Sequence, residues 1–393
     1  MNFPKPPVGM LPNDRLAYSA ITNRKPLKLP KGARMVVWVN TNVEEWDPTQ
    51  TMPRTVLTPP AGGSPMPDIP NWCWHEYGNR VGFWRLLQVY DEFKIPGVMN
   101  INGVAALAYP DIIKACVERN WEFIGHGYTQ RNMQKVENER ADIKKSAEVL
   151  ERATGIRPRG WLGPGLTETW ETPDILAEEG YDYVADWVLD DQPVWLKTRG
   201  KPILNIPYTQ ECNDVAMMLI QHHKASEYYE RAMDQFEQIY KDAKGSARVM
   251  AIVAHPYIMG APHRAKYFRQ IFQKIRKKKD VLFWTGAQIA DWFKKVGPSR
   301  PRKVSALGGV DHASTRTTAL FTDRGTRAPE AAEGRAAGGL AGAGARGMGH
   351  GPPDGAHGDL AAAGPADASR PPELELARIR HAGRGLAFLP AVR

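Results

Sequence analysis

Short runs of β-branched and aromatic residues alternate with amphipathic segments along the first three quarters of the chain, and this alternation restricts the fold more than any other feature. Runs with the composition of buried strands occur at 33–43, 96–102, 122–127, 159–165, 181–189, 202–208, 249–257 and 281–285. Segments with helical periodicity occur at 78–93, 109–120, 137–154, 172–180 and 226–243. Such alternation, over about eight units and with no fixed repeat, favours an α/β fold, a (β/α) barrel of seven to eight strands.

Polar and aromatic residues stand at the predicted carboxyl ends of these strands. In a (β/α) barrel these ends meet at one face, where function is located. We therefore expect the strand-end residues to lie around one site: Asn40, Asn42, Glu44, Glu45, His126, Gln130, Trp161, Asp186, Trp187 and His255.

The composition of the 393-residue chain changes near residue 297. All 12 Trp and all 13 Tyr precede this point, and the remainder is rich in Gly, Ala, Pro and Arg. Such a segment buries too little apolar surface to offset the entropy of ordering the chain. We predict one barrel domain at 1–297 and a disordered, non-catalytic tail at 298–393. The change of composition also fits a fusion or a shifted reading frame.

Charge and cysteine content limit the possible binding partners and the cellular location of the protein. The formal net charge is +9, but the only dense basic run, at 274–280, ends a helical pattern in which lysines complement the helix dipole. We therefore expect no nucleic-acid partner. The three cysteines share no metal-type spacing and indicate reduced thiols. No stretch approaches the ~20 apolar residues of a membrane span and residues 1–30 lack an apolar core, so we expect a cytoplasmic protein without a membrane partner.

Six motifs at the strand ends, taken in order, resemble a known family. They span about residues 35–293 and read "NTNVEEW", "EYGNRVGFWRLL", "GHGYTQ", "RGWLGPGLTETWETPDILAEEGYDYVADWVLDDQP", "IPYTQECND" and "AHPYIMGAPHR". This ordered set resembles the polysaccharide deacetylase superfamily, and within it the allantoinase-like and cyclic-imide-hydrolase-like branch. The resemblance implies a deformed TIM-like barrel and a hydrolase of carbon–nitrogen bonds other than peptide bonds.

The resemblance also implies where other members bind a metal ion. In metal-dependent members, an aspartate after the first strand and a His-x-x-x-His pair after the third hold a divalent ion. The matching positions here are Asn42, His126 and Gln130. Zinc-class ions are normally held by His, Cys, Asp or Glu, and two neutral amides supply no negative charge. We expect no cofactor, as in the allantoinase-like branch, which is regarded as metal-independent. The alternative is a zinc-class ion held by His126 with Glu44 or Glu45.

Without a metal, hydrolysis of an amide needs a base for water, an acid for the leaving nitrogen and a donor for the oxyanion. His126 and His255 end different strands, and an imidazole titrates near neutral pH. A glutamate would orient one imidazole or act as base, and we choose Glu45 over Glu44 for this role. The predicted catalytic residues are therefore Glu45, His126 and His255, with their individual roles left open.

The remaining candidates are predicted to bind substrate. The amides of Asn42 and Gln130 suit substrate carbonyls, and Glu76 and Arg80 suit polar ring atoms or a carboxylate. Trp161 and Trp187 would supply flat walls for a planar ring. Two simpler interpretations stand beside these: Glu76 and Arg80 form a structural ion pair, and the two tryptophans belong to the core.

The leading hypothesis is a metal-independent hydrolase whose partner is a small cyclic amide, imide or ureide. One alternative is a metal-dependent deacetylase of N-acetylated sugars, and another is a non-catalytic binding protein on the same fold. Family members often assemble, so we expect a homo-oligomer, and the aromatic-rich stretch 70–77 is a candidate for a subunit contact or a pocket lid.

Overall fold

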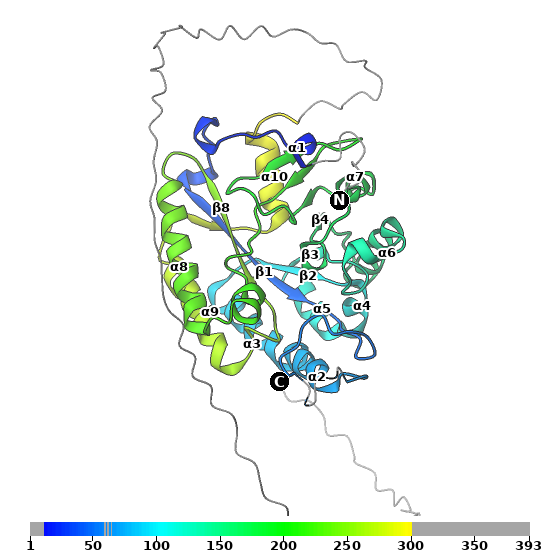
Figure 1. Ribbon diagram of the computed structural model, residues 1–393. Coiled ribbons are helices and arrows are strands. Elements are labelled where there is room, and N and C mark those ends of the chain that lie inside the picture. Colours follow the sequence, from blue (N-terminus) through cyan, green and yellow to red (C-terminus); the bar gives the residue numbers. More distant parts are fainter. Residues whose placement is uncertain (1–11, 59, 61–62, 64, 301–393) are drawn as a thin grey trace, which may run out of the picture. The chain divides into compact units, whose positions relative to one another are not determined.

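The computed structural model describes residues 12–58, 60, 63 and 65–300, so almost all of the predicted tail at 298–393 lies outside the described residues. The described part is built on a nine-stranded sheet (Figure 1). Its strands are β1 (Met35–Val43), β2 (Gly97–Ile101), β3 (Glu122–Gly125), β4 (Gly160–Trp161), β5 (Tyr183–Val184), β6 (Val194–Leu196), β7 (Ile203–Asn205), β8 (Arg248–Ala254) and β9 (Val281–Phe283).

The sheet follows the order β6-β7-β5-β4-β3-β2-β1-β8, and β9 also pairs with β1. β1 is the centre of this arrangement, with β8 along one edge and with β2 and β9 on separate halves of its length. All pairs are parallel except β6 with β7. The eight runs predicted as strands all contain one, whereas the prediction missed β6, a short antiparallel strand.

The two ends of the sheet are joined by loops rather than by a strand pair. The Val249 amide donates to the Asp191 carbonyl at 2.8 Å, and the Val253 amide donates to the Cys212 carbonyl at 3.0 Å. Through these bonds, the segments that precede β6 and follow β7 pair with the free edge of β8. The expected deformed TIM-like (β/α) barrel is therefore confirmed, and its closure is irregular.

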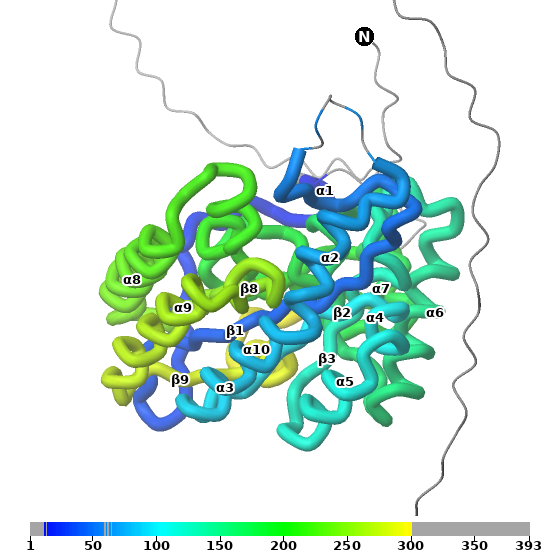
Figure 2. Tube along the Cα trace, turned by 90° about the horizontal axis from the view of Figure 1, so that it is seen from below, coloured from blue at the N-terminus to red at the C-terminus, as the bar shows by residue number. Residues whose placement is uncertain are grey.

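Helices cover the outer face of the sheet (Figure 2). Helices α8 and α9 lie side by side there, and α3 packs next to α9. The helices are α1 (Pro12–Arg15), α2 (Ile69–Tyr77), α3 (Phe83–Phe93), α4 (Gly103–Ala108), α5 (Pro110–Val117), α6 (Glu139–Thr154), α7 (Thr172–Glu178), α8 (Ala225–Asp242), α9 (Pro262–Ile275) and α10 (Gly286–Val296). Shorter helical segments include the π-helical turns η4 (Gly78–Gly82) and η7 (Val215–Ile220).

The alternation of side chains along each strand separates the two faces of the sheet. In β1, Val37 and Val39 pack with the helices of the outer layer, whereas Val36 and Trp38 pack inside the barrel. The same period of two places Val253 of β8 inside. Residues two positions beyond an interior residue therefore point toward the interior at the mouth of the barrel.

The turn η4 crosses the loop after β8 with no room for a side chain between the two backbones. A Cβ atom on Gly82 would lie 2.2 Å from the Pro256 carbonyl oxygen, and one on Gly260 would lie 2.5 Å from Gly82 Cα. A Cβ atom on Gly78 would lie 2.3 Å from the Tyr257 nitrogen. Only glycine fits at these three positions, because the obstructing atoms belong to the backbone.

Candidate active site

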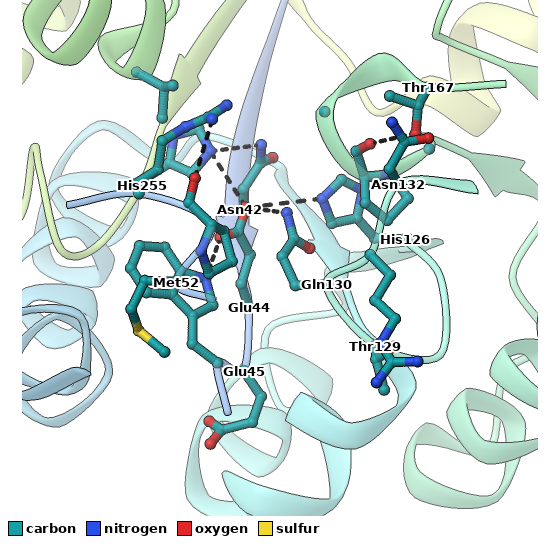
Figure 3. Close-up of a pocket in the computed structure, with 18 of the residues that line it drawn as sticks. Asn42, Glu44, Glu45, Met52, His126, Thr129, Gln130, Asn132, Thr167 and His255 are labelled. Carbon is teal, nitrogen blue, oxygen red and sulfur yellow. Dashed lines mark hydrogen bonds and ion pairs between the residues drawn. The ribbon is translucent and has the colours of Figure 1, made fainter. Parts of the chain in front are cut away.

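A cavity of about 1040 Å³ opens at the carboxyl ends of the strands (Figure 3). The alternation of side chains along the strands explains the polar lining of this cavity. Asn42 and Glu44 follow Trp38 at steps of two along β1, His126 follows Ile124 of β3, and His255 follows Val253 of β8. Four chemically active side chains from three strands therefore face one space.

Glu44 lies at the centre of this group and is almost fully buried. Its Oε1 atom is 3.8 Å from His126 Nε2 and 3.7 Å from His255 Nε2. Its Oε2 atom accepts from the Trp46 indole at 2.8 Å. Burial by itself raises the pKa of Glu44, but the two imidazoles and the indole outweigh burial and lower the pKa to about 2. The carboxylate is thus a fixed negative charge between two imidazoles.

His255 is held by an aspartate from the segment before η7. Its Nδ1 atom lies 2.6 Å from Asp214 Oδ1, and its backbone amide donates to Asp214 Oδ2 at 2.8 Å. Burial lowers the pKa of His255, but the charge and hydrogen bond of Asp214, with the charge of Glu44, outweigh burial and raise the pKa. An aspartate on Nδ1 fixes the ring so that Nε2 faces the cavity.

The ring of His126 is fixed in the same sense by a carbonyl group. Its Nδ1 atom lies 2.5 Å from the Leu162 carbonyl oxygen. Because a carbonyl only accepts, Nδ1 carries a hydrogen and Nε2 points to Glu44. Both histidines therefore present Nε2 to the cavity.

The amides of Asn42 and Gln130 turn hydrogens, not oxygens, toward this centre. Asn42 Nδ2 lies 3.0 Å from His255 Nε2, and Gln130 Nε2 donates to Glu44 Oε1 at 3.0 Å. Their oxygens are occupied elsewhere: Asn42 Oδ1 accepts from Asn100 at 2.5 Å, and Gln130 Oε1 accepts from Asn102 at 3.0 Å.

This arrangement does not fit the divalent ion that metal-dependent members hold. Two of the three equivalent positions, Asn42 and Gln130, direct N–H groups at the atoms a cation would need, and amide hydrogens repel a cation. The alternative pair of Glu44 with His126 meets the same obstacle, since Gln130 donates to Glu44. Within the described residues, no three His, Cys, Asp or Glu side chains are grouped to hold an ion.

The structure places Glu44, and not the predicted Glu45, between the two histidines. Glu45 lines the outer part of the cavity, but its carboxylate points away from the histidines and accepts from the Tyr109 hydroxyl (Figure 3). Burial, together with the neighbouring charge of Glu76, raises the pKa of Glu45. The reason is parity: Glu44 shares the interior face of Asn42, and Glu45 follows the outer face of Val43.

Glu76 and Arg80 do not line the cavity, which corrects their assignment to substrate binding. Arg80 Nε lies 2.9 Å from Glu76 Oε1 within one helical turn, and the Arg80 side chain is 75% exposed. The other oxygen of Glu76 accepts from the Tyr109 hydroxyl at 2.7 Å. The simpler interpretation, a structural ion pair, describes them.

The two tryptophans do not line the catalytic cavity. Trp161 is fully buried between the sheet and helices α6 and α7, with its ring edge-on to Tyr181. Trp187 lines a second cavity of about 600 Å³, where its indole donates to Glu168 at 2.8 Å. The flat walls of the catalytic cavity are instead Trp46, Tyr208 and Tyr257.

The position of Trp161 predicts a large effect on stability. Trp161→Ala should lower the free energy of unfolding by about 3–5 kcal/mol, because it leaves a large cavity in the core. Urea denaturation followed by circular dichroism measures this change. The control is Trp170→Ala, since Trp170 is 48% exposed and its loss should cost within about 0.5 kcal/mol. Equal losses in the two variants would contradict the core assignment.

The sequence analysis missed four residues that shape the site: Asp214, Tyr208, Asn100 and Asn102. Tyr208 accepts from Asn42 Nδ2 at 3.3 Å. The signal for Asn100 and Asn102 was present, because they continue the interior face of Val98 at steps of two. Asp214 ends the motif "IPYTQECND", but nothing in that motif indicated a contact with His255, because the two residues meet only through tertiary structure.

Comparison with known proteins agrees with the fold. Residues 73–184 match the family described as polysaccharide deacetylase. A Schizosaccharomyces pombe protein assigned as a polysaccharide deacetylase is 28% identical over 242 residues, covering 56% of this chain and 75% of that protein. A peptidoglycan deacetylase of Helicobacter pylori is 23% identical over 261 residues, covering 57% and 87%.

Two crystal structures extend the similarity over most of the described part. One is a Pseudomonas aeruginosa PAO1 protein assigned as a polysaccharide deacetylase, at 26% identity and a TM-score of 0.64, covering 71% of this chain and 97% of that one. The other is Puue allantoinase, at 25% identity and a TM-score of 0.64, covering 76% and 100%. With its strand-end motifs, its curled barrel and these relatives, the chain belongs to the polysaccharide deacetylase superfamily.

Proposed function

We propose that the protein hydrolyses a carbon–nitrogen bond in a small cyclic amide, imide or ureide without a metal ion. The observation that carries this proposal is the Glu44 carboxylate between two imidazoles, beside the amide hydrogens of Asn42 and Gln130. The similarity to an allantoinase over three quarters of the chain supports the substrate class. The broader class is not in question: the protein is a hydrolase of carbon–nitrogen bonds other than peptide bonds.

His255 is assigned as the general base. Its Nδ1 atom faces the acceptor Asp214, and its Nε2 atom faces the N–H group of Asn42. Since a donor faces Nε2, that nitrogen holds a lone pair, as a base requires. Asp214 stabilises the imidazolium that forms when the ring takes a proton.

His126 is assigned as the general acid. Both of its ring nitrogens face oxygen atoms, Leu162 O on one side and Glu44 Oε1 on the other. A doubly protonated ring therefore directs both hydrogens at acceptors. The proton on Nε2 is the one available to a leaving nitrogen.

The proposed reaction uses these groups in order. His255 Nε2 takes a proton from water while the water oxygen bonds to the substrate carbonyl carbon, and the carbonyl oxygen becomes an oxyanion. The Tyr208 hydroxyl, whose pKa is raised by burial, stays protonated and donates to this oxyanion. The C–N bond then breaks, its electron pair stays on nitrogen, and His126 protonates that nitrogen. Glu44 lies beside both Nε2 atoms and stabilises whichever ring is charged.

The first test combines metal analysis with a substrate panel. We expect purified, active protein to contain far less than one zinc, cobalt, nickel, iron or manganese ion per chain, and to keep its activity after exhaustive chelation. Among hydantoin, glutarimide, allantoin and chitotetraose, the cyclic compounds should be opened and chitotetraose should release no acetate.

Three outcomes would overturn the proposal. Activity that vanishes on chelation and returns with zinc would establish a metal enzyme. Acetate release from chitotetraose without ring opening would establish a sugar deacetylase, the function in the name of the Helicobacter pylori relative. Binding of a cyclic amide without turnover would identify a non-catalytic binding protein.

Location and assembly are part of the proposal. No helix among the described residues has the length and apolar character to span a membrane. Cys116 and Cys212 are buried free thiols, which supports a reducing compartment and a cytoplasmic location. Apolar side chains exposed near α2, such as Leu57, Met66 and Ile69, support a homo-oligomer. Cell fractionation and mass photometry measure these two properties.

A further inference from the structure

We infer that Asn100, which does not line the catalytic cavity, is a positioning residue that keeps the Nε2 atom of His255 free of a proton. It acts through the carboxamide of Asn42, whose direction it sets. The inference rests on the proposed function for the role of His255 as base, but the position of the proton is measured independently of turnover.

The first step is the contact between the two asparagines. Asn100 and Asn42 are register partners in the pairing of β2 with β1, and both side chains are buried inside the barrel. Asn100 Nδ2 donates to Asn42 Oδ1 at 2.5 Å, and it also lies 3.4 Å from Asn40 Oδ1. With its amide group committed to these two oxygens, Asn100 offers Asn42 a donor and no acceptor.

The second step follows from the chemistry of a carboxamide, which has one accepting end and one donating end. Since Asn100 occupies Oδ1 of Asn42, the NH₂ group of Asn42 turns toward His255 Nε2 at 3.0 Å and toward the Tyr208 hydroxyl at 3.3 Å. Reversing Asn42 would place its NH₂ group against that of Asn100, two donors at hydrogen-bonding distance. The hydrogen bond from Asn100 therefore fixes the orientation of the Asn42 carboxamide.

The third step reaches the imidazole. A donor on Nε2 and the acceptor Asp214 on Nδ1 together select the neutral tautomer with hydrogen on Nδ1. Asp214 by itself keeps a hydrogen on Nδ1 but does not decide whether Nε2 also carries one, because it accepts equally from the neutral ring and from an imidazolium. Glu44 Oε1 lies 3.7 Å from Nε2, beyond hydrogen-bonding distance, so Asn42 is the group that contacts this nitrogen. Asn100, acting through Asn42, supplies the donor that keeps Nε2 unprotonated.

The unpaired oxygen of Asn100 suggests the decisive substitution. Asn100 Oδ1 is buried and has no partner among the described residues. Asn100→Asp keeps the shape of the side chain but removes its donor, so that both oxygens of the new side chain accept. Asn42 should then reverse, give its NH₂ group to residue 100 and turn Oδ1 to His255. Nε2 would have to carry a hydrogen, and the ring would be protonated on both nitrogens.

A charge-matched control separates hydrogen-bond direction from electrostatic attraction. Asn40 lies on the same interior face of β1, does not line the cavity, and already accepts from Asn100 through Oδ1. Asn40→Asp adds the same charge nearby and keeps Asn100 Nδ2 as a donor. The direction of Asn42 should therefore stay as it is in the unmodified protein.

The experiment is ¹⁵N NMR of full-length protein labelled in histidine, with His255 assigned from the spectrum of His255→Gln. We expect the Nδ1–H tautomer in the unmodified protein and in Asn40→Asp, and a doubly protonated ring in Asn100→Asp at the same pH. On a cyclic amide, kcat of Asn100→Asp should fall by about 10²-fold with little change in KM, and kcat of Asn40→Asp by less than about threefold.

Three results would overturn the inference. One is an Nε2–H tautomer in the unmodified protein, which needs no variant and decides the matter if a variant does not fold. Another is the same ring protonation in Asn100→Asp and Asn40→Asp. The third is a loss of kcat in Asn100→Asp with an unchanged tautomer, the sign of a merely structural role. Protein that opens no cyclic amide yet shows the expected tautomers would refute the proposed function and leave the inference standing.

Discussion

Replacing His255 by glutamine should lower kcat for opening a cyclic amide by about 10³-fold, while KM changes by less than about threefold. Glutamine fills the space of the imidazole but cannot take a proton from water. The cavity walls formed by Trp46, Tyr208 and Tyr257 remain, so binding should be nearly unchanged. Steady-state kinetics on the best cyclic substrate measures both constants.

Asp214→Asn is the companion variant, and it adds a pH dependence with a definite sign. A base works when it is unprotonated, so kcat/KM should rise with pH through the pKa of His255, which lies above its ordinary value. Removing the carboxylate removes the main cause that raises this pKa, so the acid limb of the profile should move to lower pH. A limb that stays in place, or moves to higher pH, would contradict the assignment of His255 as base.

The second large effect is expected at Glu44. Glu44→Gln should lower kcat by about 10²–10³-fold, because it removes the negative charge that stabilises the protonated ring on either side. The variant should bind substrate normally. Kinetics on the same substrate, with isothermal titration of a ring-opened product, separate turnover from binding.

The neighbouring residue supplies a control of the same chemistry. Glu45→Gln changes the same functional group one position along the chain, but its carboxylate contacts Tyr109 and not the histidines. We expect its kcat to stay within about threefold of the unmodified protein. A larger loss in Glu45→Gln than in Glu44→Gln would show that the geometry of the mouth has been misassigned.

The contrast between these glutamates shows what the sequence predicted and what it left open. All eight predicted runs contain a strand, because buried strands carry a strong local signal in β-branched residues. That polar residues gather at the strand ends follows from the fold. Choosing between adjacent glutamates required the parity of the strand: interior residues Val36 and Trp38 continue through Asn42 to Glu44. The alternation of side chains thus places Glu44, and not Glu45, on the interior face.

The same argument applies to Trp161, and a different one to Asp214. Trp161 alternates with the interior residue Leu162 and so faces helices α6 and α7, which parity again predicts. Asp214 meets His255 across 41 positions of sequence, and the bonds that bring them together are tertiary. β6 was not predicted; it differs from the other strands in that it pairs antiparallel, with β7 alone.

The crossing of η4 over the loop after β8 bears on how the protein can diverge. Three glycines allow two backbones to touch beside His255, so any larger residue there would displace the loop that carries the histidine. The motif "EYGNRVG" is therefore selected by geometry and not by the ligand, and it should persist in descendants with different substrates. Exposed positions of the cavity wall such as Gln50, Arg54 and Arg131 carry no such constraint. New specificities should therefore arise by substitutions at the rim of the cavity, while the crossing of η4 keeps the loop that carries His255 in place.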